Sequence, residues 1–466
     1  MSLSSYLQLI EAKRVSFTPR GLDRVPALSS ALMDHQRHSV EFALRVGCAA
    51  LFLDTGLGKT LCALEWGRVV VEHTGLPVLM LAPLAVAAQH EREAVKFGID
   101  AKAVREPEQI DSPRVYITNY DRLAKFDAGQ FAGVILDESS IIKSFSGQTT
   151  KALIAAFRET PFRLCCTATP APNDHAELGQ HAEFLGVMSQ TQMLTRWFIH
   201  DSADTGNWRM KGHAVQDFWN WVASWARCVS KPSDLGFSDD GYVLPALNLR
   251  RHIVEADRSL DAGAEKDGQA RLFRMPDTSA TSIHREKRMT TQARAEVIAS
   301  LVRAEPDEPW VVWCDTDYEA DALAVLLPEA VEVRGSMSPE TKEANLTAFS
   351  TGHARVIITK PSIAGFGLNW QHAARMAFVG LSFSYESFYQ AVRRCWRFGQ
   401  ARPVNVHVAC ADTEESIWQI VSRKAGDHDA MKSEMAAAMS RASRSVPEQA
   451  PYQPAKTLAL PRWIAA

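Results

Sequence analysis

The chain has 466 residues, and its 46% hydrophobic and 23% charged content is ordinary for a globular protein of two or three domains. The formal net charge is only −3, so any contact with nucleic acid has to come from a local basic stripe rather than from the field of the whole molecule. No apolar stretch approaches the roughly 18 residues that span a bilayer, and the start lacks the charged-then-apolar order of a secretion signal. We therefore expect a cytoplasmic protein that does not act on a membrane.

The cysteines give no sign of a metal site. Eight occur, and none forms the Cys-x-x-Cys pair that structural zinc sites commonly use. Cys165 and Cys166 are adjacent inside a predicted buried strand. We expect all of them to be reduced core residues.

The first motif with chemical meaning follows a hydrophobic run at 51–53. Backbone N–H groups of a glycine turn can surround phosphate oxygens, a lysine reaches the terminal phosphates and a threonine hydroxyl ligates Mg²⁺. The apolar residues of 61–71 fit a helix whose N-terminus faces the anion. The alternative is an ordinary glycine turn between a strand and a helix. The phosphate clamp predicted here consists of Thr55, Gly56, Leu57, Gly58, Lys59 and Thr60, with Thr60 also on the metal.

Apolar runs alternate with segments of helical composition in both halves of the chain. In the first half the runs are 78–81, 115–117, 133–136 and 164–166. In the second half they are 310–313, 330–333, 356–358, 376–379 and 404–408. This rhythm is typical of parallel sheets covered on both faces, so the sequence predicts two α/β domains in tandem.

Two adjacent carboxylates, Asp137 and Glu138, end the apolar run at 133–136. In a nucleotide-hydrolysing domain, Asp137 would hold Mg²⁺, largely through water, and Glu138 would act as general base on the attacking water. An acidic pair at this place is otherwise a solvated helix start. The phosphate clamp upstream in the same domain favours the catalytic interpretation.

The predicted domains are an N-terminal lobe at 1–185, an insertion at 186–242, a C-terminal lobe at 243–425 and a helix with a loose tail at 426–466. The insertion is rich in tryptophan and is predicted to be helical, with its indoles packed in the core rather than stacked on DNA. The polar stretch 255–294 is expected to form helices and a flexible crossing between the lobes.

An arginine-rich run follows in the second domain. Arg394 and Arg397 are three residues apart, and on a helix this spacing places both guanidinium groups on one face, able to reach a γ-phosphate. Arginine fingers of this kind accelerate hydrolysis by about 10³ to 10⁵. The alternative is a basic helix face in solvent or on nucleic acid.

With these motifs in this order, the chain resembles the superfamily-two helicases, and within them the Swi/Snf-related double-stranded DNA translocases, over about 32–408. The resemblance implies an α/β fold of two RecA-like parallel-sheet lobes with a helical insertion at their junction. It also implies ATP and Mg²⁺ as cofactors. By this resemblance Gln36 reads adenine, Gly367 and Gln390 also contact the nucleotide, and Pro83, Asn119, Thr167, Thr169, Gly365 and Asn369 contact DNA or couple it to ATP.

Two positions depart from the family pattern. Ser140 stands where the family's Asp-Glu-Ala-His box has its histidine, which removes an imidazole that links ATP to the lobe interface. Arg393 stands where the family usually has aspartate, which reverses the charge beside Arg394.

The expected activity is that of a DNA-dependent ATPase that translocates along duplex DNA without sequence preference, because most contacts would go to phosphates. One alternative is a strand-separating helicase, and another is an ATP-gated DNA clamp that hydrolyses weakly, which only Ser140 and Arg393 favour. RNA remodelling is less favoured because the final motif ends in Gly399-Gln400. The compact form resembles motors encoded by bacteriophages and mobile elements, which would place it in a bacterial cytoplasm, with a protein partner as one source of specificity.

Overall fold

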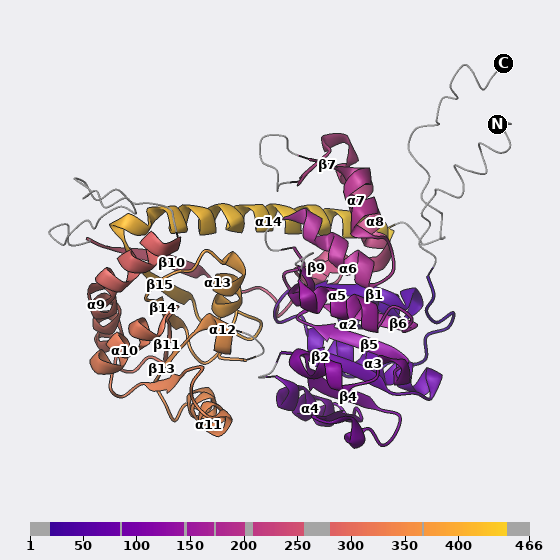
Figure 1. Cartoon of the computed structure of the whole chain (residues 1–466), viewed down its shortest axis with the longest axis horizontal. Coiled ribbons are helices and arrows are strands. Elements are labelled where there is room, and N and C mark those ends of the chain that lie inside the picture. The colour runs from indigo at the N-terminus through magenta and orange to yellow at the C-terminus, as the bar shows by residue number, and fades with distance from the viewer. Residues whose placement is uncertain are drawn as a thin grey trace, which may run out of the picture. The chain divides into compact units, whose positions relative to one another are not determined.

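The computed structural model describes residues 19–444, apart from 84–85, 144–146, 172–173, 201–207, 256–279 and 366–367. The described residues form two compact units, labelled by element in Figure 1. Unit 1 runs to Ser238 and includes the chain from Ala430 on, and unit 2 runs from Asp239 to Asp429. None of the helices in these described ranges has the length and hydropathy that a bilayer crossing requires.

Unit 1 is built on a seven-stranded parallel sheet in the order β3-β4-β2-β5-β6-β1-β9. Its strands are β1 (Cys48–Leu53), β2 (Val78–Ala82), β3 (Ala101–Ala103), β4 (Val115–Asn119), β5 (Gly133–Asp137), β6 (Phe162–Cys166) and β9 (Ala226–Val229). Its helices are α2 (Asp34–Val46), α3 (Lys59–Thr74), α4 (Ala87–Lys96), α5 (Gln148–Ala156), α6 (Leu178–Phe184), α7 (Gln190–Trp197) and α8 (Val215–Trp225). The strands β1, β2, β5 and β6 are buried along their whole length, as strands covered on both faces must be.

Unit 2 is built on a six-stranded parallel sheet in the order β10-β15-β14-β11-β13-β12. Its strands are β10 (Leu247–Val254), β11 (Trp310–Trp313), β12 (Val331–Val333), β13 (Val356–Thr359), β14 (Arg375–Phe378) and β15 (Val404–Ala411). Its helices are α9 (Ala280–Ala304), α10 (Asp317–Leu326), α11 (Pro339–Ser350), α12 (Pro361–Ala364) and α13 (Tyr385–Val392). A last helix, α14 (Glu415–Arg444), begins in unit 2 and ends in unit 1.

The prediction of two parallel-sheet α/β lobes is confirmed, but three strands of the sheets, β3, β9 and β10, and a short hairpin were not predicted. The segment 186–242 contains the helices α7 and α8, but it also contains the short hairpin β7 (Phe198–His200) with β8 (Trp208–Met210), and β9, which joins the sheet beside β1. β9 is only four residues long and follows α8 directly, so no separate apolar run marks it. β10 is an edge strand with mostly exposed or half-buried residues, so it lacks the continuous apolar run of a buried strand.

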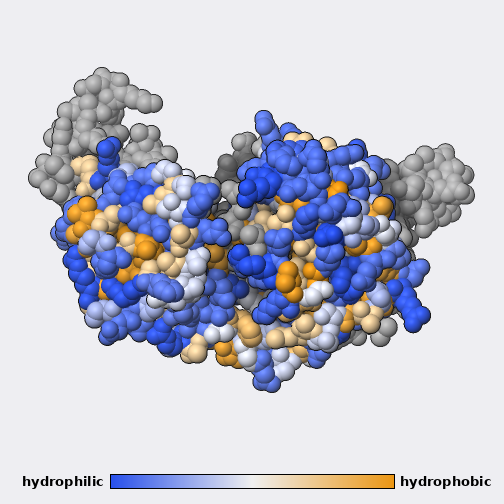
Figure 2. Space-filling model, turned by 90° about the horizontal axis from the view of Figure 1, so that it is seen from below, coloured by the Kyte–Doolittle hydropathy of each residue, from blue (hydrophilic) through white to orange (hydrophobic). Residues whose placement is uncertain are grey.

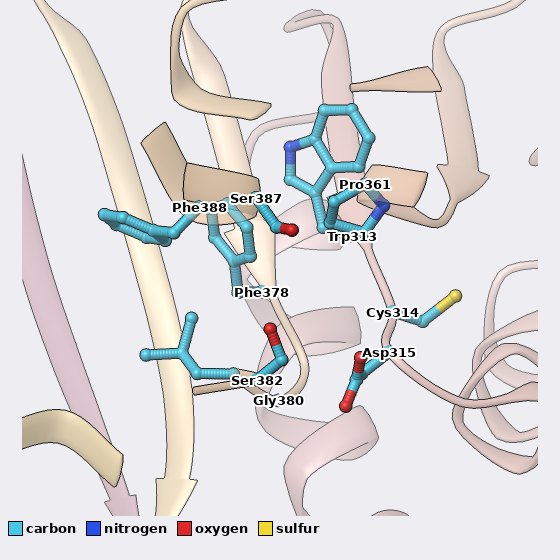
Figure 3. Close-up of a pocket in the computed structure, with 10 residues that line it drawn as sticks. Trp313, Cys314, Asp315, Pro361, Phe378, Gly380, Ser382, Ser387 and Phe388 are labelled. Carbon is cyan, nitrogen blue, oxygen red and sulfur yellow. The ribbon is translucent and has the colours of Figure 1, made fainter. Parts of the chain in front are cut away.

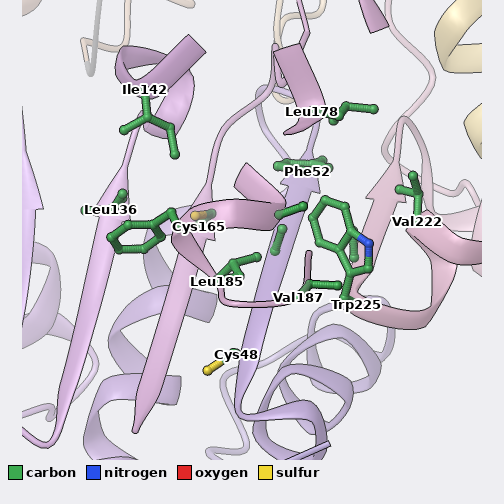
Figure 4. Close-up of a cluster of buried hydrophobic side chains, with 14 of the residues drawn as sticks. Cys48, Phe52, Leu136, Ile142, Cys165, Leu178, Leu185, Val187, Val222 and Trp225 are labelled. Carbon is green, nitrogen blue, oxygen red and sulfur yellow. The ribbon is translucent and has the colours of Figure 1, made fainter. Parts of the chain in front are cut away.

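The insertion tryptophans belong to the core of unit 1. Trp197, Trp219 and Trp225 are buried in the same cluster as Phe52 of β1 and Leu136 of β5. Figure 4 shows Trp225 and Val222 of α8 beside Phe52 and Leu178. This burial agrees with the packing interpretation of these tryptophans.

All eight cysteines are buried and free of disulfide bonds. The 255–294 stretch is described in part: α9 covers its end, whereas 256–279, where the flexible crossing was expected, lies outside the described residues. Figure 2 shows hydrophilic residues over most of one face, with hydrophobic residues in small groups among them, as on most folded proteins.

Candidate active site

The carboxyl ends of β5, β6 and β1 bring three predicted motifs together. These strands are neighbours in the sheet, with Asp137 opposite Cys166 in one pair and Leu51 opposite Cys166 in the other. The acidic pair, the Thr167 segment and the phosphate loop therefore leave the sheet side by side. Ligands of open α/β sheets bind at this edge.

The phosphate loop has the backbone that the sequence predicts. Gly56 and Gly58 have φ of 95° and 79°, values that residues with a side chain rarely adopt, and α3 begins directly after Gly58. Lys59 Nζ donates to the carbonyl oxygen of Leu53 at 3.0 Å, so the ammonium lies across the loop. Glycines of this conformation before a helix N-terminus fit a bound phosphate chain.

Gln36 and Asp54 are both hydrogen-bonded to the backbone of this loop. Gln36 Nε2 donates to the carbonyl oxygen of Leu57 at 3.1 Å, and a Cβ atom on Gly58 would lie 2.3 Å from the same nitrogen. Asp54 Oδ1 accepts from the amide of Thr55 at 2.6 Å, and Asp54 Oδ2 pairs with Lys432 Nζ of α14 at 2.9 Å. The sequence predicts Gln36 near the nucleotide, but it carries no signal for Lys432.

Glu138 has a left-handed backbone conformation, which is uncommon for residues other than glycine. Among the described residues it is the only non-glycine residue with a positive φ, at 52°. Such strain is concentrated at functional sites, where the surroundings hold it in place. Glu138 Oε2 accepts from Thr167 Oγ1 at 3.3 Å, and Thr167 Oγ1 accepts from the amide of Thr169 at 3.1 Å. The predicted base is thus tied to the predicted coupling motif.

Asp137 is bonded to His90 and Tyr120, which are not among the predicted site residues. His90 Nε2 of α4 lies 2.7 Å from Asp137 Oδ2, and both side chains are buried. Burial opposes a charge on His90, but the carboxylate of Asp137 raises the pKa of His90 above its ordinary value. Tyr120 Oη donates to the carbonyl oxygen of Asp137 at 2.7 Å, and burial, together with the Asp137 charge, raises the pKa of Tyr120 well above its usual range.

A second histidine lies beside the acidic motif. Ser140, at the family's histidine position, is buried in a 3₁₀ turn, and its neighbour Ser139 has its Oγ 3.1 Å from His181 Nε2 of α6. Burial lowers the pKa of His181 to about 4, so this imidazole is neutral at neutral pH. Two other elements thus bring imidazoles to a motif whose own histidine is replaced.

Pro83 and Asn119, predicted to contact DNA, lie together farther along the same sheet edge. Pro83 follows β2 directly, Asn119 ends β4, and Ala82 is opposite Asn119 in the pairing of these strands. Leu84, which follows Pro83 in the predicted DNA-contacting motif, and Asn173, which follows the predicted coupling motif of Thr167 and Thr169, lie outside the described residues.

In unit 2 the prediction that Arg394 and Arg397 lie on a helix is wrong. α13 ends at Val392, and the chain continues in tight turns in which the amides of Arg394 and Cys395 bond to carbonyls three residues earlier. The two guanidinium groups converge nevertheless, because both donate to the carbonyl oxygen of Leu368, at 3.0 Å and 3.1 Å. Arg394 is buried and also bonds to Gln390, which explains why the chain tightens here instead of extending the helix.

Other predicted residues of unit 2 lie around this turn. Gly365 ends α12, where a Cβ atom would lie 2.2 Å from the carbonyl oxygen of Pro361, and Asn369 is exposed. Gly367 lies outside the described residues. The guanidinium of Arg393 lies 5.0 Å from the ring centre of Trp396, so stacking on an aromatic ring accommodates this departure from the family pattern.

A small pocket opens at the carboxyl ends of β11 and β14 in unit 2. Figure 3 shows the rings of Trp313, Phe378 and Phe388 in its upper part and the oxygen atoms of Asp315 and Ser382 in its lower part. No residue predicted for the site lines this pocket.

The chain is similar in sequence to proteins of the helicase family. Residues 292–399 match the model of the helicase conserved C-terminal domain. The chain is 29% identical over 443 residues to the SWI/SNF-related matrix-associated actin-dependent regulator of chromatin subfamily A-like protein 1 of Xenopus tropicalis, covering 85% of this chain and 44% of that protein. It is 23% identical over 456 residues to the DNA annealing helicase and endonuclease ZRANB3 of Mus musculus, covering 87% of this chain and 41% of that protein.

The chain thus spans less than half the length of these two relatives. The matched helicase domain lies within unit 2, and both units are built on parallel sheets. Together, the matched helicase domain, the two relatives and the two parallel-sheet lobes support a superfamily-two helicase of the Swi/Snf type.

Proposed function

We propose that this chain is a DNA-dependent ATPase that uses hydrolysis to move along duplex DNA. The observation that carries the proposal is the convergence of the phosphate loop, the acidic pair and Thr167 at one sheet edge of unit 1. The two relatives support DNA as the substrate, since one is named as a regulator of chromatin and the other as a DNA annealing helicase.

In the proposed reaction, the amides of Thr55 to Gly58 and the ammonium of Lys59 bind the phosphates of ATP. Thr60 and Asp137 would hold Mg²⁺, which neutralises charge on the phosphate oxygens. Glu138 takes a proton from the attacking water, and its bond to Thr167 connects this step to the coupling motif.

Arg394 and Arg397 would stabilise the charge that develops on the γ-phosphate. Their convergence on the carbonyl of Leu368 supports this assignment, because it places two cations at one point of unit 2. Gln36 and Gln390 would complete nucleotide binding. Pro83, Asn119, Gly365 and Asn369 would contact the DNA backbone, so affinity should fall steeply with salt.

Displacement of the third strand from a DNA triplex tests movement along a duplex. The expected result is ATP-dependent displacement by the wild-type protein and none by Glu138→Gln. A protein that instead separates forked duplexes and leaves triplexes intact is a strand-separating helicase. Duplex binding that responds to ATP without hydrolysis would identify an ATP-gated clamp.

A further inference from the structure

His90 lies outside the acidic motif, but its side chain contacts a residue of that motif. It is the fourth residue of α4, the helix that follows β2, yet its ring reaches the end of the neighbouring strand β5. It is 3% exposed, and its Nε2 lies 2.7 Å from Asp137 Oδ2. The only carboxylate that would face Mg²⁺ from β5 therefore has one of its oxygens bonded to α4.

The contact restrains the Asp137 side chain. A buried imidazole and a buried carboxylate each lose hydration, and that loss is offset only while the two stay bonded. Tyr120 fixes the backbone of the same residue through its carbonyl oxygen. Asp137 is therefore held at its main chain by one element and at its side chain by another.

We propose that His90 is a positioning residue for Asp137, which fixes the orientation of the carboxylate that binds Mg²⁺ with the nucleotide. Outer partners of metal-binding groups have this effect in general, and their loss typically lowers metal affinity or activity by about 10 to 100 times. The proposal rests on the proposed function, since it concerns the metal of the same site. It also explains how an acidic motif with Ser140 in place of histidine keeps an imidazole at its metal-binding residue.

The rival explanation is that His90 only fills space under α4. The two explanations differ in the Mg²⁺ concentration that nucleotide binding requires. A purely structural histidine affects the free energy of unfolding, whereas a positioning histidine also raises the Mg²⁺ requirement. Binding of a fluorescent ADP analogue at increasing free Mg²⁺ measures that requirement without depending on hydrolysis.

His90→Phe keeps a ring of similar size and removes the donor. We expect its Mg²⁺ midpoint for ADP binding to rise at least about tenfold. His90→Gln places an amide donor near the position of Nε2, so its midpoint should stay within about threefold of wild type because the hydrogen bond is retained. Tyr116→Phe removes a buried hydroxyl at the opposite end of the sheet, where it bonds to Asp111 and Ser112, and should leave the midpoint unchanged.

If His90→Phe does not fold, His90→Asn replaces it, since its shorter amide does not reach Asp137, and the same tenfold rise is expected. Wild-type midpoints in both His90→Phe and His90→Asn, or a rise in His90→Gln as large as in His90→Phe, would overturn the positioning role. Absence of ADP binding by the wild-type protein at any Mg²⁺ concentration would instead overturn the proposed function on which it rests.

Discussion

The acidic edge of unit 1, formed by Asp137 and Glu138, and the arginine turn of unit 2, formed by Arg394 and Arg397, carry opposite charges. The two regions also differ in the groups to which their side chains are hydrogen-bonded. Asp137 and Glu138 are bonded by side chains from three other elements: His90, Tyr120 and Thr167. Arg394 and Arg397 both donate to one backbone carbonyl, that of Leu368, 26 and 29 residues earlier in the chain, and Arg394 also bonds to Gln390. In the proposed reaction the surrounding fold holds the carboxylates in place, whereas the arginines would have to share or exchange the carbonyl of Leu368 to bind a phosphate.

The largest effect is expected at the arginine turn. Arg397→Ala should lower kcat by about 10³, with little change in nucleotide affinity, because an arginine finger acts mainly on the transition state. Single-turnover hydrolysis and equilibrium ATP binding measure the two quantities. Arg402→Ala is the matched control, since Arg402 is 46% exposed, pairs with Glu308 at the surface and should leave kcat unchanged. An unaltered kcat in Arg397→Ala would assign Arg397 to surface charge.

At the acidic edge, Glu138→Gln should retain ATP binding and lower kcat by about 10² or more, because a general base is lost while the shape of the site is kept. The same two assays apply. Glu72→Gln, an exposed carboxylate on α3 that pairs with Arg68, should behave as wild type. Near wild-type turnover in Glu138→Gln would remove Glu138 as the base and would leave its positive φ without a catalytic explanation.

The stability of unit 1 should depend on pH through His181, which lies beside the acidic edge. The folded-state pKa of His181 is about 4, below the usual 6.5, so the unfolded chain binds a proton first as the pH falls. The contribution of His181 to the free energy of unfolding should therefore be fully present above about pH 6.5. It should fall by up to about 3 kcal/mol as the pH is lowered toward 4. Urea unfolding at several pH values measures the loss. His181→Gln should flatten the dependence, and an unchanged slope would contradict the buried, neutral state of His181.

The smallest effect concerns the attachment of α14 to the phosphate loop. Lys432→Met removes the ion pair with Asp54, but the Asp54 carboxylate keeps its bond from the Thr55 amide, so the free energy of unfolding should fall by only about 1 to 2 kcal/mol. Thermal unfolding measures this change. Lys424→Met, at a half-buried lysine on the same helix that donates to the carbonyl oxygen of Phe383 instead of to the phosphate loop, serves as the control. A loss of several kcal/mol would mean that α14 contributes much more to unit 1 than this contact accounts for.

The sequence predicts the parts of the site that local chemistry determines. The left-handed glycines of the phosphate loop and the acidic pair at the end of a buried strand are readable because their backbone positions require those residue types. His90 and Lys432 were missed because each meets its partner only through the fold, 47 and 378 residues away in the chain. The turn after α13 was missed because buried contacts of Arg394, rather than helix propensity, decide its backbone.

The same limit applies to the origin of the chain. The phage or mobile-element source stays a prediction, since the relatives from Xenopus tropicalis and Mus musculus bear on the family alone.

The most direct test of the central claim is steady-state ATP hydrolysis by the pure protein at low salt, alone and with duplex DNA, single-stranded DNA or RNA. Low salt keeps phosphate contacts strong, so stimulation by a true substrate should be largest there. We expect low basal turnover and strong, selective stimulation by duplex DNA. Stimulation by single strands or RNA with none by duplex, or an absence of hydrolysis with every nucleic acid, would contradict a duplex-dependent motor.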